Sequence, residues 1–228
     1  MSQTAIVAGE TLSERAVARI EADIVTGALA PGARLGIIET AARYGVGATP
    51  LREALSRLVA RGLVDAVGKR GFRVKAISRE DLADIVRVRT VIECEALRLS
   101  MANGGGDWEG EIVAALHQLR RYARLNRCGV LEGEPEFDVL HKAFHTALIA
   151  ACGSPRMLAA HSELYDQAYR YRRLMMREFP DPEVFLAAHD QLADFALRRK
   201  ENEACSTLEA HIALTLRHVY PDPARHSA

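Results

Sequence analysis

The feature that most constrains the fold is a series of helical segments that fills the last two thirds of the chain. It is divided by breaks rich in glycine and proline at residues 103–106, 133–135, 153–155 and 180–182. The apolar spacing between these breaks predicts helices over residues 79–102, 108–127, 135–152, 155–178, 181–199 and 201–219. No strand candidate follows residue 76. Consecutive helices can bury their apolar faces only against each other. We therefore predict an all-α antiparallel helical bundle over residues 81–222, with a tail at 223–228.

The N-terminal third has a different pattern. An apolar face that recurs every four residues is formed by Leu12, Ala16, Ile20 and Ile24. The whole segment predicts three helices and then two strands, at residues 11–27, 39–44, 49–62, 63–67 and 72–74. This is the element order of a winged helix-turn-helix, whose wing is a small β-hairpin. The predicted fold class is therefore mainly α, with residues 1–76 as the winged domain and 77–80 as a hinge.

Short polar and special residues mark the expected helix ends. Ser13 is the predicted N-cap of the first helix, and Gly27 its end. Pro50 stands in the first turn of the third helix, where its missing N–H costs nothing. Ser78 and Asp81 resemble a capping box at the start of the bundle.

Charge and hydropathy limit the partners and the location. Residues 1–76 carry eleven Lys and Arg against seven Asp and Glu, a net charge of +4, and the remainder of this neutral chain carries −4. A basic N-terminal domain suits a nucleic-acid partner. No apolar run reaches the ~18–20 residues of a membrane span, and residues 1–10 lack the pattern of a secretory signal. We expect no membrane association and a cytoplasmic location.

The four cysteines are widely separated: Cys94, Cys128, Cys152 and Cys205. They form no C-x-x-C pair, which argues against a zinc finger or a redox motif. We expect buried, reduced thiols.

A specific motif runs through the winged domain. Residues 30–35 read A-P-G-A-R-L, residues 45–55 read G-V-G-A-T-P-L-R-E-A-L, and residues 68–74 read G-K-R-G-F-R-V. In this order and at these distances, the run resembles the DNA-binding domain of the GntR family of transcription regulators. The resemblance implies that residues 49–62 form the recognition helix and that residues 68–71 form the tip of the wing.

The candidate DNA-binding residues are Thr49, Arg52, Arg57, Lys69, Arg70 and Gly71. A recognition helix presents its N-terminal residues to base edges in the major groove. Thr49 lies at that end, and Arg52, one turn later, can bind a guanine with two hydrogen bonds worth about 1–3 kcal/mol of discrimination. The residues of the wing tip can approach phosphates or the minor groove. Arg57 is further along the helix and is expected to face phosphate or solvent.

Two segments depart from the GntR pattern. The family usually has Ser-Arg where this chain has Gly47 and Ala48, and charged residues where Ile37 and Ile38 stand. Both changes remove possible base or phosphate contacts. They predict weaker DNA binding or a divergent operator.

Residues 80–220 resemble the FCD ligand-binding domain, the effector domain of FadR-type GntR regulators. The resemblance is carried by residues 81–89 (D-L-A-D-I-V-R-V-R), by residues 144–155 (F-H-T-A-L-I-A-A-C-G-S-P), and by the segments around His189 and His211. It implies a helical domain that senses a small molecule.

The resemblance also implies a metal site. Many FCD domains bind a divalent metal with one Asp and three His on three helices, and the three histidine positions match His145, His189 and His211. The Asp position is His141 here, which shares a helix face with His145 because the two are four residues apart. This departure either gives a site of four imidazoles or leaves His141 outside the site. Asp138 is a fallback oxygen ligand. An all-nitrogen set favours a divalent transition metal such as zinc or nickel over Mg²⁺ or Ca²⁺.

The remaining histidines show no such pattern, and we expect them at the surface: His117, His161, His218 and His226. Beside the metal site, Arg89 and Arg172 are candidate partners for a carboxylate, because a guanidinium can donate two parallel hydrogen bonds to it. The expected effector is a small organic acid or sugar acid.

These observations predict a homodimeric repressor whose operator binding responds to the effector. An alternative is a metal-dependent, hydrolase-like enzyme, since a three-His site can activate water. The sequence contains no H-E-x-x-H, nucleophile elbow or Gly-rich phosphate loop, so we expect no enzyme. A third possibility, suggested by Gly47 and Ala48, is a dimeric sensor module with impaired DNA binding.

Overall fold

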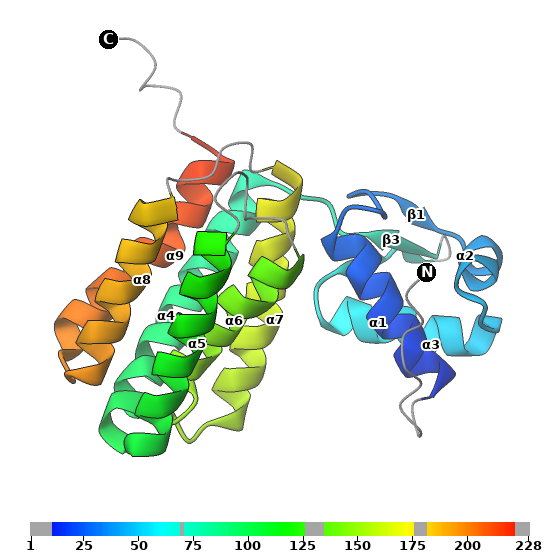
Figure 1. The fold of residues 1–228 in the computed structure, drawn as a ribbon. Coiled ribbons are helices and arrows are strands. Elements are labelled where there is room, and N and C mark those ends of the chain that lie inside the picture. Colours follow the sequence, from blue (N-terminus) through cyan, green and yellow to red (C-terminus); the bar gives the residue numbers. More distant parts are fainter. Residues whose placement is uncertain (1–10, 69–70, 126–134, 176–181, 222–228) are drawn as a thin grey trace, which may run out of the picture. The chain divides into compact units, whose positions relative to one another are not determined.

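The computed structural model describes residues 11–68, 71–125, 135–175 and 182–221 (Figure 1). The chain divides into two compact units, residues 1–77 and 78–228. The mainly α fold class, with a small antiparallel sheet in the N-terminal part, is confirmed. Each unit is described by itself below.

The first unit is a three-helix domain with a small sheet. Its elements are α1 (Leu12–Val25), β1 (Arg34–Leu35), α2 (Ile37–Tyr44), α3 (Ala48–Ala60), β2 (Val64–Ala66) and β3 (Phe72–Val74). The predicted hairpin of β2 and β3 is confirmed, with Val64 opposite Val74. The strand β1 was not predicted; it pairs with the other edge of β3 and places Arg34 opposite Arg73. A strand of two residues is too short to show the alternation of apolar and polar residues that predicts a strand.

Packing of α1 on α3 forms the centre of this unit. Ile20 and Ile24 of α1 and Leu51, Leu55 and Leu58 of α3 are all fully buried. Burial of each such side chain contributes about 1.5–3 kcal/mol. The apolar face predicted for α1 is therefore buried at Ala16, Ile20 and Ile24, where it packs on α3, whereas Leu12 is 53% exposed.

The N-cap predicted for α1 was wrong. Thr11, not Ser13, caps the helix: its hydroxyl accepts a hydrogen bond from the Glu14 N–H (3.2 Å), and Glu14 Oε2 accepts one from the Thr11 N–H (2.8 Å). This reciprocal pair is a capping box, and Ser13 lies buried inside the first turn. The helix ends at Val25, and Gly27 follows it with a φ of +81°, the left-handed conformation that favours glycine.

The second unit is a helical bundle, shown from turquoise to red in Figure 1. Its helices are α4 (Arg79–Asn103), α5 (Gly106–Leu125), α6 (Pro135–Ile149), α7 (Pro155–Met175), α8 (Pro182–Leu197) and α9 (Glu201–Val219). Ser78 is the N-cap of α4, since its hydroxyl accepts from the Asp81 N–H. Only this half of the predicted capping box is present, because the Ser78 N–H donates to the Tyr171 hydroxyl. The helix predicted over 135–152 ends earlier, at Ile149. The predicted ends at 127 and 178 and the tail at 223–228 lie outside the described residues.

The long helix α4 packs against α6, α7 and α9, while α8 packs against α5 and α9. This arrangement brings one face of α6, α8 and α9 together with residues of α4 and α7. None of the described helices is long and apolar enough to cross a membrane.

The three described cysteines, Cys94, Cys152 and Cys205, are buried and free, as predicted. Cys128 lies outside the described residues. Cys94 on α4 and Cys205 on α9 each place Sγ 3.7 Å from the other's backbone carbonyl. Burial raises the pKa of the Cys94 thiol to about 12. The thiol therefore stays protonated, and we interpret the two cysteines as part of the packing between α4 and α9.

Candidate metal and effector site, and the DNA-binding segment

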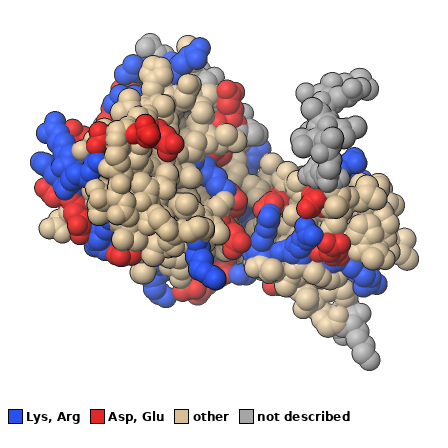
Figure 2. All heavy atoms as spheres, turned by 90° about the horizontal axis from the view of Figure 1, so that it is seen from below, with Lys and Arg blue, Asp and Glu red and all other residues tan. Residues whose placement is uncertain are grey.

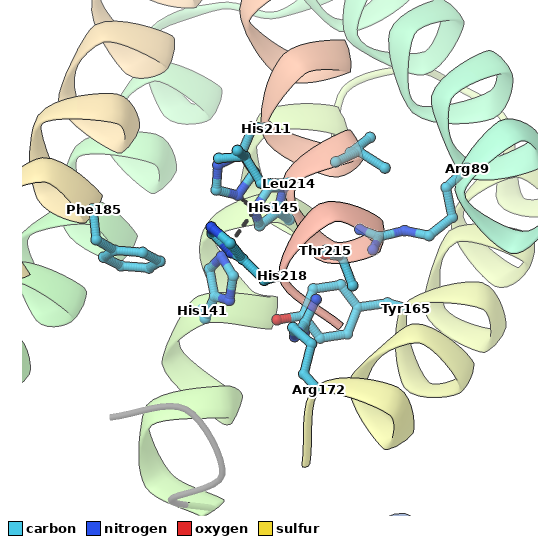
Figure 3. Close-up of a pocket in the computed structure, with 11 residues that line it drawn as sticks. Arg89, His141, His145, Tyr165, Arg172, Phe185, His211, Leu214, Thr215 and His218 are labelled. Atoms are coloured by element: carbon cyan, nitrogen blue, oxygen red, sulfur yellow. Dashed lines mark hydrogen bonds between the residues drawn. The ribbon is translucent and has the colours of Figure 1, made fainter. Parts of the chain in front are cut away.

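Four histidines from three helices converge inside the bundle. They are His141 and His145 on α6, His189 on α8 and His211 on α9. The ligand atoms that they offer all lie within 4.8 Å of one another. The Nε2 atom of His145 lies 3.1 Å from that of His141 and 3.2 Å from that of His211 (Figure 3). The structure thus brings together the four histidines that the sequence singled out.

The His189 ring is oriented by its own helix. Its Nδ1 lies 2.7 Å from the Phe185 carbonyl oxygen, and a carbonyl can only accept, so Nδ1 carries the proton. The unprotonated Nε2 is buried and has no hydrogen-bond partner among the described residues. Metal-ligating histidines commonly donate their second ring nitrogen to a backbone carbonyl or carboxylate in this way.

Burial keeps these imidazoles neutral. Loss of solvation is the largest cause that lowers the pKa of His189 to about 4. Burial, followed by repulsion from neighbouring histidines, also lowers the pKa values of His141, His145 and His211 well below the usual value. A neutral imidazole is the form that binds a metal.

The residues present fit a late divalent transition metal. The buried, unpartnered Nε2 of His189 needs an electron-pair acceptor, and the converging donors are all nitrogens. Asp138, the fallback ligand, is not one of the four converging residues. Its carboxylate interacts with Tyr169, whose pKa is raised by burial and then by this carboxylate. His141 occupies the place expected for an acidic ligand.

A pocket opens beside the histidine cluster (Figure 3). Cationic, aromatic and small polar side chains from α4, α6, α7, α8 and α9 line it: Arg89, His141, His145, Tyr165, Arg172, Phe185, His211, Ile212, Leu214, Thr215 and His218. Both arginines named by the sequence analysis are therefore in the pocket wall, next to three of the four histidines.

Both arginines are buried, at 2% exposure for Arg89 and 4% for Arg172. Each guanidinium carbon lies 5.0 Å from the centre of the Tyr165 ring, within the range of a cation–π interaction. Arg89 also donates from Nε to Glu93 Oε1 at 2.7 Å. Burial alone would raise the pKa of Glu93, but Arg89 and then His161 outweigh it and hold that pKa at about 2.

One prediction about the other histidines was wrong. His161, expected at the surface, is 1% exposed and places Nδ1 3.0 Å from Glu93 Oε1. His218 is exposed as expected, but it lines the pocket. His117 is exposed, and His226 lies outside the described residues. Glu93 was not predicted as a site residue, although its four-residue spacing from Arg89 places the two on one helix face.

In the winged unit, α3 places Thr49 in its first turn and exposes Thr49, Arg52 and Arg57. Arg57 donates to Glu53 at 2.7 Å. A surface hollow is lined by Arg52, by Gly71 (φ +92°) of the predicted wing tip, and by Arg34 of β1, which was not among the predicted residues. Lys69 and Arg70 lie outside the described residues. On the face drawn in Figure 2, positive and negative side chains are interspersed.

The first unit is a winged helix-turn-helix whose α3 is exposed at its N-terminal end, and the second is a helical unit that contains a pocket. This combination is typical of two-domain transcription regulators. Residues 12–74 match the family of bacterial regulatory proteins called gntR, and residues 84–214 match the FCD domain. The chain belongs to the GntR family of transcription regulators, in the branch that carries an FCD domain.

Named relatives agree with this assignment. The HTH-type transcriptional repressor GlaR of Escherichia coli K12 is 36% identical over 83% of this chain and 87% of its own length. The HTH-type regulator BphR of Paraburkholderia xenovorans LB400 is 38% identical over 89% of this chain and 82% of its own. Among solved structures, E. coli McbR/YncC superposes with a TM-score of 0.74 at 20% identity, over 92% of this chain and 98% of its own. At that identity the likeness concerns the fold.

Proposed function

We propose that this regulator is a metal-containing repressor whose operator binding is controlled by a small organic acid or sugar acid. The observation that carries the proposal is the convergence of four neutral, largely buried imidazoles beside two buried arginines in one pocket. A pocket of this kind attracts anions, and it belongs to a chain with a DNA-binding domain.

His141, His145, His189 and His211 would hold the metal, with zinc or nickel favoured by the all-nitrogen donor set. When bound, the metal would supply a positive charge that attracts the acid and that neutral imidazoles do not provide. The other contacts to the acid come from the chain's own residues. Arg89 and Arg172 can donate paired hydrogen bonds to a carboxylate, while Tyr165 packs against both guanidinium groups and limits their movement.

DNA recognition is assigned to Thr49, Arg52 and Arg57 of α3 and to Lys69, Arg70 and Gly71 of the wing. In a homodimer, two recognition helices must match half-sites about one DNA turn apart. An effector that binds better to one domain arrangement than to the other shifts the population between them. Ligand-relieved repression is the form that we propose.

Two measurements test this function. Thermal unfolding is followed against a panel of small organic and sugar acids, with and without a strong chelator. A ligand specific for the folded state stabilises it by about 2.7 kcal/mol at a hundredfold excess over its Kd. We expect one acid to raise the midpoint and the chelator to abolish that rise. If no acid and no chelator changes the midpoint, the metal and effector proposal is wrong.

The second measurement is fluorescence anisotropy with the DNA upstream of the protein's own coding sequence. We expect sequence-specific binding that weakens as salt rises and that the stabilising acid reverses. Binding that is equal for this DNA and a scrambled duplex would favour the alternative, a sensor module with impaired DNA binding. The observation behind that alternative is Gly47, whose position at the start of α3 carries no side-chain cap.

A further inference from the structure

Glu93 on α4 is a buried carboxylate whose surroundings the proposed function leaves unexplained. Its side chain is 1% exposed. Burying an isolated charge is costly, so its partners must account for its presence. Those partners come from three helices: Arg89 on α4, His145 on α6 and His161 on α7.

The two carboxylate oxygens have different partners. Oε1 accepts from Arg89 Nε at 2.7 Å and lies 3.0 Å from His161 Nδ1. Oε2 faces His145 Nδ1 at 3.9 Å. His145 directs its other nitrogen, Nε2, into the histidine cluster. One carboxylate therefore lies between an arginine of the pocket wall and a histidine of the cluster.

His145 Nδ1 is buried and has no hydrogen-bond partner among the described residues. A histidine that binds a metal through Nε2 carries its proton on Nδ1, and this proton needs an acceptor. Glu93 Oε2, which faces Nδ1 at 3.9 Å, belongs to an ionised carboxylate that can only accept hydrogen bonds, and it can therefore serve as this acceptor.

We propose that Glu93 is a positioning residue that orients His145 for metal binding and, through its other oxygen, fixes Arg89 at the pocket wall. The inference rests on the proposed metal site. A carboxylate that accepts from Nδ1–H selects the tautomer with a free Nε2 and raises the basicity of that nitrogen. The same group holds the guanidinium, so the position of Arg89 and the metal affinity depend on a single side chain.

The competing explanation is that Glu93 and Arg89 form only a structural ion pair. The two explanations differ in what Glu93→Gln changes. A structural pair predicts lower stability with unchanged metal affinity in the molecules that fold. A positioning role predicts a loss of metal affinity, because a neutral amide is a weaker acceptor for Nδ1–H.

The test is the zinc affinity of the metal-free full chain, measured by competition with a chromophoric chelator at constant pH. We expect Glu93→Gln to weaken zinc binding by about 10–100-fold, the effect typical of losing such a partner. His161→Gln is the matched control, because it removes the other imidazole at Glu93 but touches no histidine of the cluster. It should stay within about threefold of the unaltered chain, well below that range.

Loss of Glu93 alone leaves Arg89 without its buried counter-charge and can prevent folding. A double variant, Arg89→Met with Glu93→Gln, removes both charges, a replacement that folded proteins often tolerate. It should show the same 10–100-fold loss of zinc affinity. Unchanged affinity in the double variant, or an equal loss in His161→Gln, would overturn the positioning role. A failure of the unaltered chain to bind zinc would instead overturn the proposed metal site, and this inference with it.

Discussion

His141 and His145 lie one turn apart on α6, and their Nε2 atoms are 3.1 Å apart. Two protonated imidazoles could not occupy this buried position, because like charges at this distance repel strongly in a poorly solvated site. The pair is therefore suited to binding a cation, and not to carrying charge itself.

The first prediction concerns the residue at the position where the family has Asp. Replacing His141 by Asp adds an oxygen donor and a negative charge to the cluster, and oxygen donors favour manganese relative to an all-nitrogen set. We expect His141→Asp to bind Mn²⁺ more tightly and to shift the Zn²⁺/Mn²⁺ affinity ratio toward Mn²⁺ by at least about tenfold. Competitive titration of the two metals measures the ratio. His117→Asp, at an exposed position of α5, is the control, and an equal shift there would contradict the prediction.

The second prediction concerns pH. Burial lowers the pKa of His189 to about 4 from 6.5, so between these values the unfolded chain binds a proton that the folded chain does not. Stability therefore rises with pH in this window and is lost as pH falls below 6.5. We expect the metal-free protein to lose about 1.4 kcal/mol per pH unit for each such imidazole. Urea unfolding with a chelator at pH 7, 6 and 5 measures the slope, and His189→Asn should reduce it. A stability that does not change from pH 7 to 5 would refute the prediction.

The third prediction concerns the recognition helix. Arg52 is exposed in the first half of α3, next to the hollow that Gly71 lines. If it reads a guanine, Arg52→Ala costs about 1–3 kcal/mol, or about 5–150-fold in operator affinity. Binding to random DNA should weaken much less. Anisotropy titrations with the two duplexes measure both effects. Arg87→Ala, an exposed arginine of α4 paired with Asp84, should leave both affinities unchanged.

The fourth prediction tests the packing that joins α5 to its neighbours. A Cβ on Gly104 would overlap the ring of Trp108, whose Nε1 donates to the Ala147 carbonyl at 2.9 Å. Gly104→Ala should destabilise the protein by about 1–3 kcal/mol, because the ring cannot move without losing that bond. Gly105→Ala meets nothing within 4 Å and serves as the matched control. Chemical denaturation gives both values, and equal stabilities for the two variants would disprove the close packing.

The local sequence pattern was sufficient to predict most of the helices and strands. The long amphipathic segments predicted the helices of the bundle, because a helix of several turns repeats its apolar spacing many times. The same reasoning missed β1 and placed the cap of α1 on Ser13. In both cases the deciding contact is a single pairing: of Arg34 with Arg73 across the sheet, and of Thr11 with Glu14 at the helix end.

The sequence by itself determined the family, the helical character of the second unit and the identity of the four clustered histidines. These follow from residue types at fixed spacings along the chain. Only the tertiary structure decided what surrounds them. It buried His161, expected at the surface, against Glu93, and it set both pocket arginines against Tyr165. The physical reason is that burial and charge pairing depend on which helices pack together, and α4, α6 and α7 meet through contacts between residues far apart in the sequence.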